Sequence, residues 1–396
     1  HLSNKETNLK VEKKLRLLGK GLDHYIQEVD KQLFNLVKDF ELLPMLNPAN
    51  LEEEKKRFFA SHTRNPEFKY NQIPVNTFSF KKKLYDIPVD TIQDINIQHL
   101  YKDTITSYAD KIDMINTIGT TDFLYNSLRY YGEPNEIDIA NARYLLHCPH
   151  VVNPDDEIEV TTEQVKQYMD ATIRQYGFQC KIEVTDNITA AAQVVNSKKT
   201  LMLKKNAKFS LYDSKILANH EVGVHLVTTI NARLQPLKIF QLGLPINTLT
   251  QEGLAVLSEY LSGSLNTYRL RELGYRTLAI RFMLKGNDFR KTYIFLTEEF
   301  GMNEEAAFYL TTRLFRGGGF TKDYLYLRGF RDMVNFYKSG KSMKPLLIGK
   351  TSLKYIHIIK EMIERKQALS PKYQTHAFLS PIHNNKILDY IVSGIK

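Results

Sequence analysis

Two histidines and a glutamate stand together in the middle of the chain, in the run His220-Glu221-Val222-Gly223-Val224-His225. A second run, Gln251-Glu252-Gly253-Leu254-Ala255, follows further along. Imidazole and carboxylate groups are the ligands of catalytic zinc, which keeps three protein ligands and leaves a fourth position open for water and substrate. The pattern therefore indicates a zinc hydrolase site with His220, His225 and Glu252 as ligands.

The two histidines are five residues apart, whereas the familiar zinc-protease motif places them four apart. On a regular helix, five residues put about 140° between two side chains, which is too wide for one tetrahedral ion. We therefore expect the helix to be overwound or bulged at this point. Gly223 lies where such a bulge could form.

Two further glutamates belong to the same pattern. Glu221 directly follows the first ligand, where a carboxylate can act as general base on a metal-activated water without binding the metal itself. Glu259 lies seven residues after Glu252, on the same helix face, and is either a spare ligand or a carboxylate that orients a histidine. A purely structural zinc site would need a fourth protein ligand, and no cysteine or further histidine lies close in sequence.

A long helix should carry the histidines. Ser210 and Asp213 have capping-box spacing, which predicts a helix that begins there and runs towards Leu234, ending before Pro236. Both histidines then lie in mid-helix.

A second helix should carry Glu252. Thr248 and Gln251 repeat the capping-box spacing, so that Glu252 would fall in the first turn. Gly253 beside it would let two helices approach closely.

A small sheet is expected immediately before the histidine helix. Short strands are predicted at Gln179 to Thr185, Ala190 to Val195 and Leu201 to Lys204. We expect Leu201-Met202-Leu203 to be the edge strand that lines the cleft and pairs with an extended substrate backbone.

Helical periodicity dominates the rest of the chain, which predicts an α+β fold that is predominantly α. We expect a helical N-terminal region over residues 1–150 and a metallopeptidase region over 151–396. An irregular stretch is expected from about residue 62 to Pro88. Helices are predicted from Lys5 to about Leu42, Leu51 to Ser61, between Asp90 and Leu146, Thr162 to Tyr176, Leu270 to Leu284, Phe289 to Phe300, Glu304 to Phe315, Tyr324 to Tyr337, and Lys354 to Glu364.

Composition excludes several classes of protein. The chain has 396 residues, of which 43% are hydrophobic and 25% charged, as in ordinary globular proteins. No run approaches the roughly 18 apolar residues of a membrane span, and no secretion signal is evident. Two cysteines are too few for a disulfide framework, which favours the cytoplasm. The net charge of +10 is dispersed along the chain, and no RNA- or DNA-binding motif stands out, so we expect no nucleic-acid partner. An acidic peptide substrate would explain the positive charge as well as a nucleic acid would.

The run Glu252-Gly253-Leu254-Ala255, after the His-Glu-x-x-x-His helix and Gln235-Pro236-Leu237, resembles the bacterial "flavohemoglobin expression-modulating QEGLA motif proteins". These are related to the eukaryotic microtubule-associated tyrosine carboxypeptidases. The resemblance extends to the run from Phe320 to Gly329 and, more loosely, to most of the chain. It implies a gluzincin-like zinc metallopeptidase fold in which His220, His225 and Glu252 bind one Zn²⁺ and Glu221 is the base. The eukaryotic relatives remove a C-terminal tyrosine from tubulin, and the activity class carries over better than this substrate.

An enzyme that cuts at a C-terminus must neutralise the terminal carboxylate, which arginine does through two hydrogen bonds and lysine as a point charge. Arg313, Arg316 and Lys322 flank the run Gly317-Gly318-Gly319 and are candidates for substrate binding. The three glycines permit tight turns and close approach to a ligand. No Lys-Ser/Thr pair follows them, so we do not expect a phosphate-binding loop.

The developing oxyanion needs a donor in addition to the metal, and Tyr326 is our candidate, with Tyr324 as its alternative. We therefore expect a zinc-dependent peptidase, more specifically a carboxypeptidase that removes a tyrosine or another aromatic residue from the C-terminus of a peptide or protein. The alternative is a non-catalytic regulator or binding protein on a peptidase-like scaffold.

Overall fold

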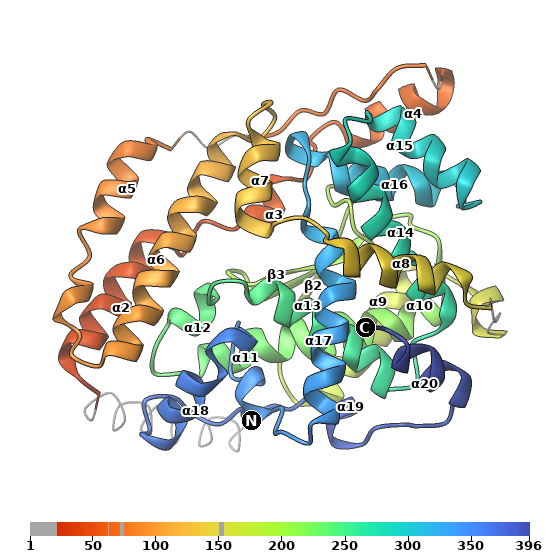
Figure 1. Ribbon diagram of the computed structural model, residues 1–396. Helices are drawn as coiled ribbons and strands as arrows, with labels where there is room; N and C mark the ends of the chain where they lie inside the picture. Colours follow the sequence, from red (N-terminus) through yellow and green to blue (C-terminus); the bar gives the residue numbers. More distant parts are fainter. Residues whose placement is uncertain (1–21, 62, 72–74, 150–153) are drawn as a thin grey trace.

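The computed structural model describes residues 22–61, 63–71, 75–149 and 154–396. Helices make up most of the described chain and two small sheets complete it (Figure 1), so the predicted α+β fold, predominantly α, is confirmed. In the described ranges, no helix is both long and apolar enough to cross a membrane.

Seven α-helices precede the first sheet in the described N-terminal ranges, and the predicted helix from Leu51 to Ser61 is confirmed. The part of the predicted first helix before residue 22 lies outside the described residues. The prediction of an irregular stretch up to Pro88 is wrong, because Asn76 caps a helix there and Phe80 and Leu84 are buried on its inner face. The helices are α2 (His24–Val37), α3 (Leu42–Met45), α4 (Leu51–Ser61), α5 (Thr77–Tyr85), α6 (Ile95–Asn116), α7 (Phe123–Tyr131) and α8 (Glu136–His147).

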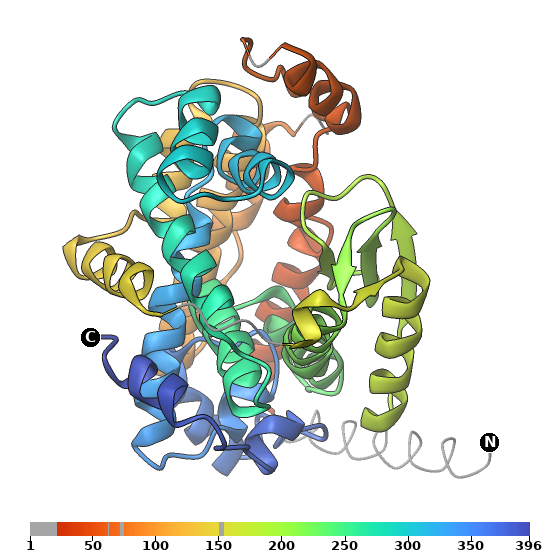
Figure 2. The same cartoon turned by 90° about the vertical axis from the view of Figure 1, so that its right-hand side faces the viewer.

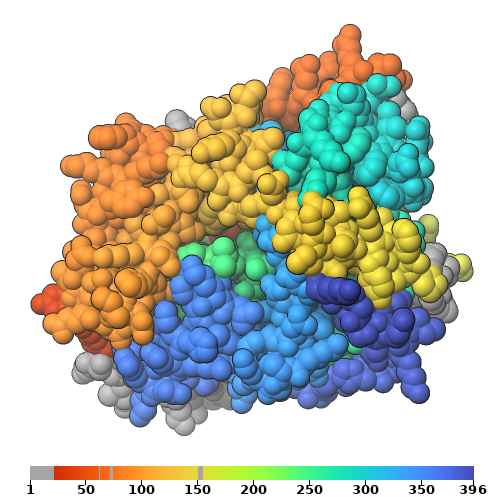
Figure 3. Space-filling model, viewed as in Figure 1, coloured from red at the N-terminus to blue at the C-terminus, as the bar shows by residue number. Residues whose placement is uncertain are grey.

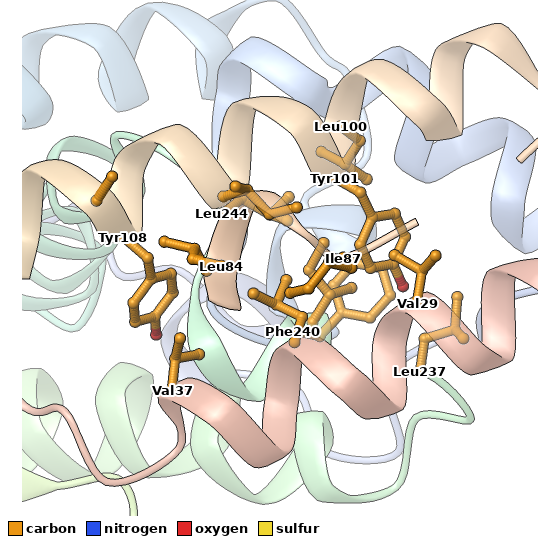
Figure 4. Packing of buried hydrophobic residues seen from close by; sticks show 14 of the residues in the cluster. Val29, Val37, Leu84, Ile87, Leu100, Tyr101, Tyr108, Leu237, Phe240 and Leu244 are labelled. Atoms are coloured by element: carbon orange, nitrogen blue, oxygen red, sulfur yellow. The ribbon is translucent and has the colours of Figure 1, made fainter. Parts of the chain in front are cut away.

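The N-terminal helices share a hydrophobic core with a later part of the chain. Side chains of α2 and α6 pack around Leu237, Phe240 and Leu244, which belong to or flank α12 (Ile239–Leu242) (Figure 4). The carboxylate of Asp30 accepts hydrogen bonds from the backbone N–H groups of Lys238 and Ile239 at 2.7 and 2.9 Å. This core contains residues from before and after position 150. The division of the chain into two regions at that position stays a prediction.

The larger sheet contains β2 (Lys181–Thr185), β4 (Thr200–Lys204) and β3 (Ala192–Val195), in that spatial order. Strand β4 pairs in parallel with β2 and antiparallel with β3. The prediction that Leu201-Met202-Leu203 forms the edge is therefore wrong: it belongs to the central strand, and β3 is an edge. Periodicity alone predicts which residues form strands but not the order of the strands in the sheet.

Helix α9 (Thr162–Tyr176) covers one face of this sheet and packs on β2 and β4 (Figure 2). Leu201 and Leu203 are fully buried in the cluster that α9 forms with the histidine helix. A separate pair of short antiparallel strands, β1 (Glu159–Val160) and β5 (Phe209–Ser210), leads into that helix.

The histidine helix begins at the predicted capping box, in which Ser210 and Asp213 bond each other's backbone N–H groups. It consists of α10 (Leu211–Leu217), a π-helical stretch η3 (Ala218–Leu226) and α11 (Val227–Arg233). The expected bulge at the two histidines is thus confirmed and takes the form of a π-helix.

The next long helix, α13 (Asn247–Leu261), carries Glu252. The predicted capping box of Thr248 and Gln251 is wrong, because the helix begins after Ile246, whose backbone is left-handed (φ 54°) and whose side chain makes no capping bond. Glu252 therefore lies in the second turn, where its side chain faces the π-helix.

Helices α13 and α17 (Leu325–Lys338) pack backbone against backbone in the middle of the molecule (Figure 1). A Cβ atom added at Gly253 would lie 2.3 Å from the carbonyl oxygen of Gly329, and one at Gly329 would lie 2.2 Å from that of Leu249. The predicted close approach at Gly253 is confirmed. It joins the Glu252 helix to the Phe320–Gly329 region of the sequence.

The remaining helices complete the body around these two. The prediction for Glu304 to Phe315 is confirmed to the residue, and the predicted helix from Phe289 becomes an α-helix followed by a π-helical stretch. These helices are α14 (Thr267–Leu284), α15 (Phe289–Ile294), η4 (Phe295–Glu299), α16 (Glu304–Phe315), α18 (Ile356–Glu364), α19 (His376–Leu379) and α20 (Lys386–Ser393).

Candidate metal centre

The π-helix brings His220 and His225 to the same side of the histidine helix. Hydrogen bonds from residue i to i+5 stack side chains that are five residues apart, which a regular α-helix does not do. The two imidazole rings lie with their centroids 4.9 Å apart and their planes at 73°. The five-residue spacing is therefore compatible with a single ion.

Glu252 reaches this pair of rings from α13. Its Oε2 atom lies 3.2 Å from Nε2 of His220 and 3.3 Å from Nε2 of His225. A tetrahedral ion with bonds of about 2.0–2.1 Å holds its ligands about 3.3–3.4 Å apart. The Oε2 atom is buried and accepts no hydrogen bond in the described structure. The three residues therefore fit a divalent metal, and no other described His, Cys, Asp or Glu joins their group.

Lys322 holds the second oxygen of Glu252. Its ammonium group lies 2.7 Å from Oε1, and both side chains are buried. Burial raises the pKa of Glu252, but the charges of Lys322 and His225 outweigh it and hold that pKa well below its usual range. Lys322 thus keeps Glu252 ionised and leaves one oxygen for a metal.

His220 is oriented through its other ring nitrogen. Nδ1 lies 2.7 Å from Oε1 of Glu259, whose Oε2 accepts a hydrogen bond from Nε of Arg269 at 3.1 Å. Glu259 therefore orients a histidine, which is one of the two roles expected for it. It contacts Nδ1 of the His220 ring rather than Nε2. Burial lowers the pKa of His220, but the carboxylates of Glu252 and Glu259 raise it to about 10, so a metal must displace a proton there.

The partner of His225 is a neutral amide, whereas the partner of His220 is a carboxylate. Nδ1 lies 3.5 Å from Oε1 of Gln251, and this amide oxygen accepts hydrogen bonds from Thr228 and Lys350 at 3.0 and 3.3 Å. The Lys350 ammonium also donates to the carbonyl oxygen of His225 at 2.9 Å. Burial lowers the pKa of Lys350 to about 7. The sequence reasoning missed Lys350, which lies in the loop between α17 and α18 with no motif to mark it.

Thr375 contacts the π-helix from the C-terminal region. Its fully buried hydroxyl group donates to the carbonyl oxygen of Gly223 at 2.7 Å. The wider turn of a π-helix leaves carbonyl groups without their usual i+4 partners, and the Gly223 and His225 carbonyls both accept bonds from side chains far along the chain. The sequence carried no signal for Thr375 either.

The three metal-binding candidates face a cleft whose other wall is β3 and the segment before it. Glu221, 8% exposed, lines this cleft beside His220. The hydroxyl group of Tyr326 lies 3.0 Å from the Lys322 ammonium, and its ring stacks on His220 with centroids 6.1 Å apart. Tyr324 instead donates to the backbone oxygen of Tyr131, outside the cleft lining. The structure thus brings Glu221 and Tyr326 to the same cleft.

The two arginines expected to bind substrate differ in their partners. Arg313 pairs with Asp323 through Nε and Nη2 at 2.7 and 2.9 Å. Arg316 donates from Nη1 to the hydroxyl of Thr189 at 2.9 Å, and no carboxylate lies within ion-pair distance of it among the described residues. Both line the cleft, together with Lys322. The glycines that follow Arg316 have φ values of 75°, 120° and 124°, which confirms the tight turn expected there.

The cleft continues into a further hollow on each side. One hollow is lined by basic and aromatic groups, including Lys111, Tyr130 and Lys350, and the other by side chains such as Ile216, Leu310 and Tyr309. In Figure 3 the surface is hollowed between α6 and α7, in orange, and the blue C-terminal helices, with green atoms at its floor.

The alternative of a structural zinc site gains no support, because the described group offers three ligands rather than four. A search of curated proteins gives no significant match to the chain. The family described as microtubule-associated tyrosine carboxypeptidase matches residues 56–396, which include every candidate site residue named above. The chain therefore belongs to the microtubule-associated tyrosine carboxypeptidase family.

Proposed function

We propose that the protein is a zinc-dependent peptidase of gluzincin-like architecture that removes a residue from the C-terminus of a peptide or protein. The observation that carries this proposal is the open triad: one carboxylate oxygen at tetrahedral spacing from a nitrogen of each of two imidazoles, facing a cleft, with Glu221 beside them. Family membership supports the carboxypeptidase assignment. The unpaired cysteines, Cys148 and Cys180, are in keeping with a cytoplasmic enzyme.

His220, His225 and Glu252 would hold the Zn²⁺, which when bound supplies a Lewis acid for the scissile carbonyl group and for water. Glu221 takes the proton from the attacking water and returns it to the leaving amine. The hydroxyl group of Tyr326, which also contacts Lys322 and Arg313, donates to the oxyanion that develops. Lys322 contributes indirectly, by keeping Glu252 ionised.

The groove along β3 favours a substrate in extended conformation. Strand β3 pairs with β4 on one side only, so its other edge can accept a peptide backbone. Of the two adjoining hollows, the one lined by Ile216, Leu310 and Tyr309 suits an aromatic terminal side chain, and the basic one suits acidic residues that precede it. We propose an acidic peptide tail that ends in an aromatic residue as the preferred substrate.

The test is hydrolysis of a peptide library, read by mass spectrometry with and without a chelator. We expect metal-dependent loss of single C-terminal residues by the wild-type protein. Glu221→Gln should retain stoichiometric zinc, because Glu221 is not a ligand, and lose about 10²–10⁴-fold in rate, the usual contribution of a general base. Wild-type rates in this variant, or absence of bound divalent metal in the wild type, would exclude the proposed mechanism. Intact metal without trimming would favour the alternative of a binding protein.

A further inference from the structure

The cationic side chains of the cleft differ in whether their charges are already compensated. Arg313 is bound to Asp323, and the Lys322 ammonium is bound to Glu252. The Lys350 ammonium already donates to three oxygen atoms, on His225, Thr228 and Gln251. The charges of Arg313 and Lys322 are therefore already compensated by carboxylates, and Lys350 uses all three of its N–H groups.

Arg316 is different. It is only 3% exposed, yet its one hydrogen bond within the described structure is the bond from Nη1 to Thr189. Its Nε atom is buried without a partner, and the guanidinium lies over the ring of Phe320 at 4.8 Å. Burial and the positive charge of Arg313 lower the pKa of Arg316 to about 10. Asp323 attracts this charge, but from beyond ion-pair distance. A buried cation without an ion-pair partner is costly, and an anionic ligand would supply the missing negative charge.

A second donor in the same cleft lacks a partner. The Nε2 atom of Gln193, on the edge strand β3, is buried and makes no hydrogen bond in the described structure. Gln193 is 7% exposed and lines the cleft together with Arg316. The cleft therefore offers donors on two elements, and its ligand must bring acceptors.

We propose that Arg316, assisted by the amide of Gln193, is the anchor for the terminal carboxylate of the substrate and thereby restricts the enzyme to C-terminal residues. This inference rests on the proposed function and assigns the anchor to one of its three candidate cations. The shape of the groove alone would not impose the restriction, because the cleft continues into a hollow on each side. A guanidinium that binds the terminal carboxylate through two hydrogen bonds would impose the restriction to C-terminal residues.

The experiment measures binding rather than turnover. The zinc-loaded Glu221→Gln variant is titrated with dansyl-Ala-Ala-Ala-Tyr as the free acid and as the C-terminal amide, and fluorescence gives the two dissociation constants. We expect the acid to bind about 10- to 100-fold more tightly, as for a charge-assisted hydrogen-bonded pair. Adding Arg316→Gln should bring the ratio of the two constants close to one, and Arg316→Lys should restore part of it. Gln193→Leu should reduce the ratio by several-fold.

The matched control is Arg233→Gln, which removes a positive charge from the basic hollow beside the cleft and leaves Arg316 in place. It should preserve the ratio. Thermal melting and zinc content show whether each variant is folded, and Arg316→Lys and Gln193→Leu test the anchor if Arg316→Gln does not fold.

Equal binding of acid and amide by the Glu221→Gln protein, or a ratio that Arg316→Gln leaves unchanged, would overturn the anchor. That result is separate from the fate of the proposed function. A wild-type protein that trims peptides but ignores the terminal charge retains the function and loses the anchor. A protein that trims nothing but prefers the acid through Arg316 retains the anchor and loses the function.

Discussion

At the scale of single residues, each metal-binding candidate is oriented by a partner that is itself held. Glu252 is bound by Lys322, His220 by Glu259, and Glu259 in turn by Arg269. Such partners determine which ring nitrogen carries the proton and where its lone pair points. Metal affinity in this protein should therefore depend on side chains that never touch the metal.

Glu259→Gln tests this dependence. The amide cannot provide the negative charge that holds the Nδ1 proton of His220, so we expect zinc affinity to fall about 10- to 100-fold. Competition with a chromophoric chelator measures the change. Glu272→Gln is the control, because Glu272 also pairs with Arg269, at 3.1 Å, but contacts no histidine. An unchanged zinc affinity in Glu259→Gln would show that its contact with His220 is dispensable.

At the scale of elements, the π-helix η3 decides whether the two histidines can share an ion. The wider turn of the π-helix lets two histidines that are five residues apart point to the same side. Thr375 and Lys350 donate hydrogen bonds to carbonyl groups of that turn. These two side chains come from loops that are distant in sequence. The register of the histidine helix is thus set partly by tertiary contacts.

Removal of the Thr375 hydroxyl should loosen η3. For Thr375→Val we expect about tenfold weaker zinc binding and faster amide hydrogen exchange over residues 218–227 in the metal-free protein, because a buried carbonyl loses its partner. Thr375→Ser keeps the donor and should restore both properties. Thr104→Val is the matched control, because the hydroxyl of Thr104 is equally buried and donates to the Leu100 carbonyl at 2.7 Å, within α6.

The control should lower the melting temperature without altering zinc affinity. If Thr375→Val and Thr104→Val affect zinc affinity equally, Thr375 has no specific role in the metal site. If exchange over residues 218–227 stays as slow as in the wild type, the hydroxyl does not hold the π-helix.

At the scale of the whole molecule, a chain of buried and half-buried charges lies behind the metal site and joins α13, α14 and α16. Its carboxylates and guanidinium groups alternate, and Arg276 links Glu272 to the Asp323–Arg313 pair at 2.7 and 3.9 Å. The chain consists of Glu259, Arg269, Glu272, Arg276, Asp323 and Arg313. Breaking one link leaves the neighbouring buried charge unpaired.

This network predicts sensitivity to acid. Burial raises the pKa of Glu272, but the charges of Arg276 and Arg269 outweigh it and lower the pKa to about 2. A carboxylate with a lowered pKa stabilises the fold above its unfolded-state pKa and loses that effect as pH falls towards the folded value, here between about 4.5 and 2. Glu272→Gln should lower the free energy of unfolding at pH 7 by about 1–3 kcal/mol, since the side chain is 30% exposed.

Denaturant titrations of the wild type and of Glu272→Gln from pH 7 to pH 2 measure this effect. The difference between the two proteins should shrink as the pH falls below about 4.5, because the wild-type carboxylate takes up a proton in the unfolded state there and in the folded state only near pH 2. A difference that is constant over this range would show that Glu272 stabilises the fold by packing and not by charge.

The sequence by itself determined which residues form the candidate metal site. Residue type and order identified His220, His225 and Glu252, and the capping box at Ser210 identified the start of the histidine helix. The spacing of five predicted an overwound or bulged helix between the histidines, and the structure has the bulge, as a π-helix. Local signals sufficed for the cap at Ser210 because the interaction lies within one element, but the same signal at Thr248 and Gln251 failed.

Only the tertiary structure decided the rest. The order of the strands, the start of α13 at Ile246, and the contacts of Lys350 and Thr375 with the π-helix depend on segments that are distant in sequence. The same holds for Arg316, whose residue type matches Arg313 but whose partner does not. A charge is available to a ligand only when no neighbour neutralises it, and neighbours across the fold are set by packing, which no periodicity in the chain records.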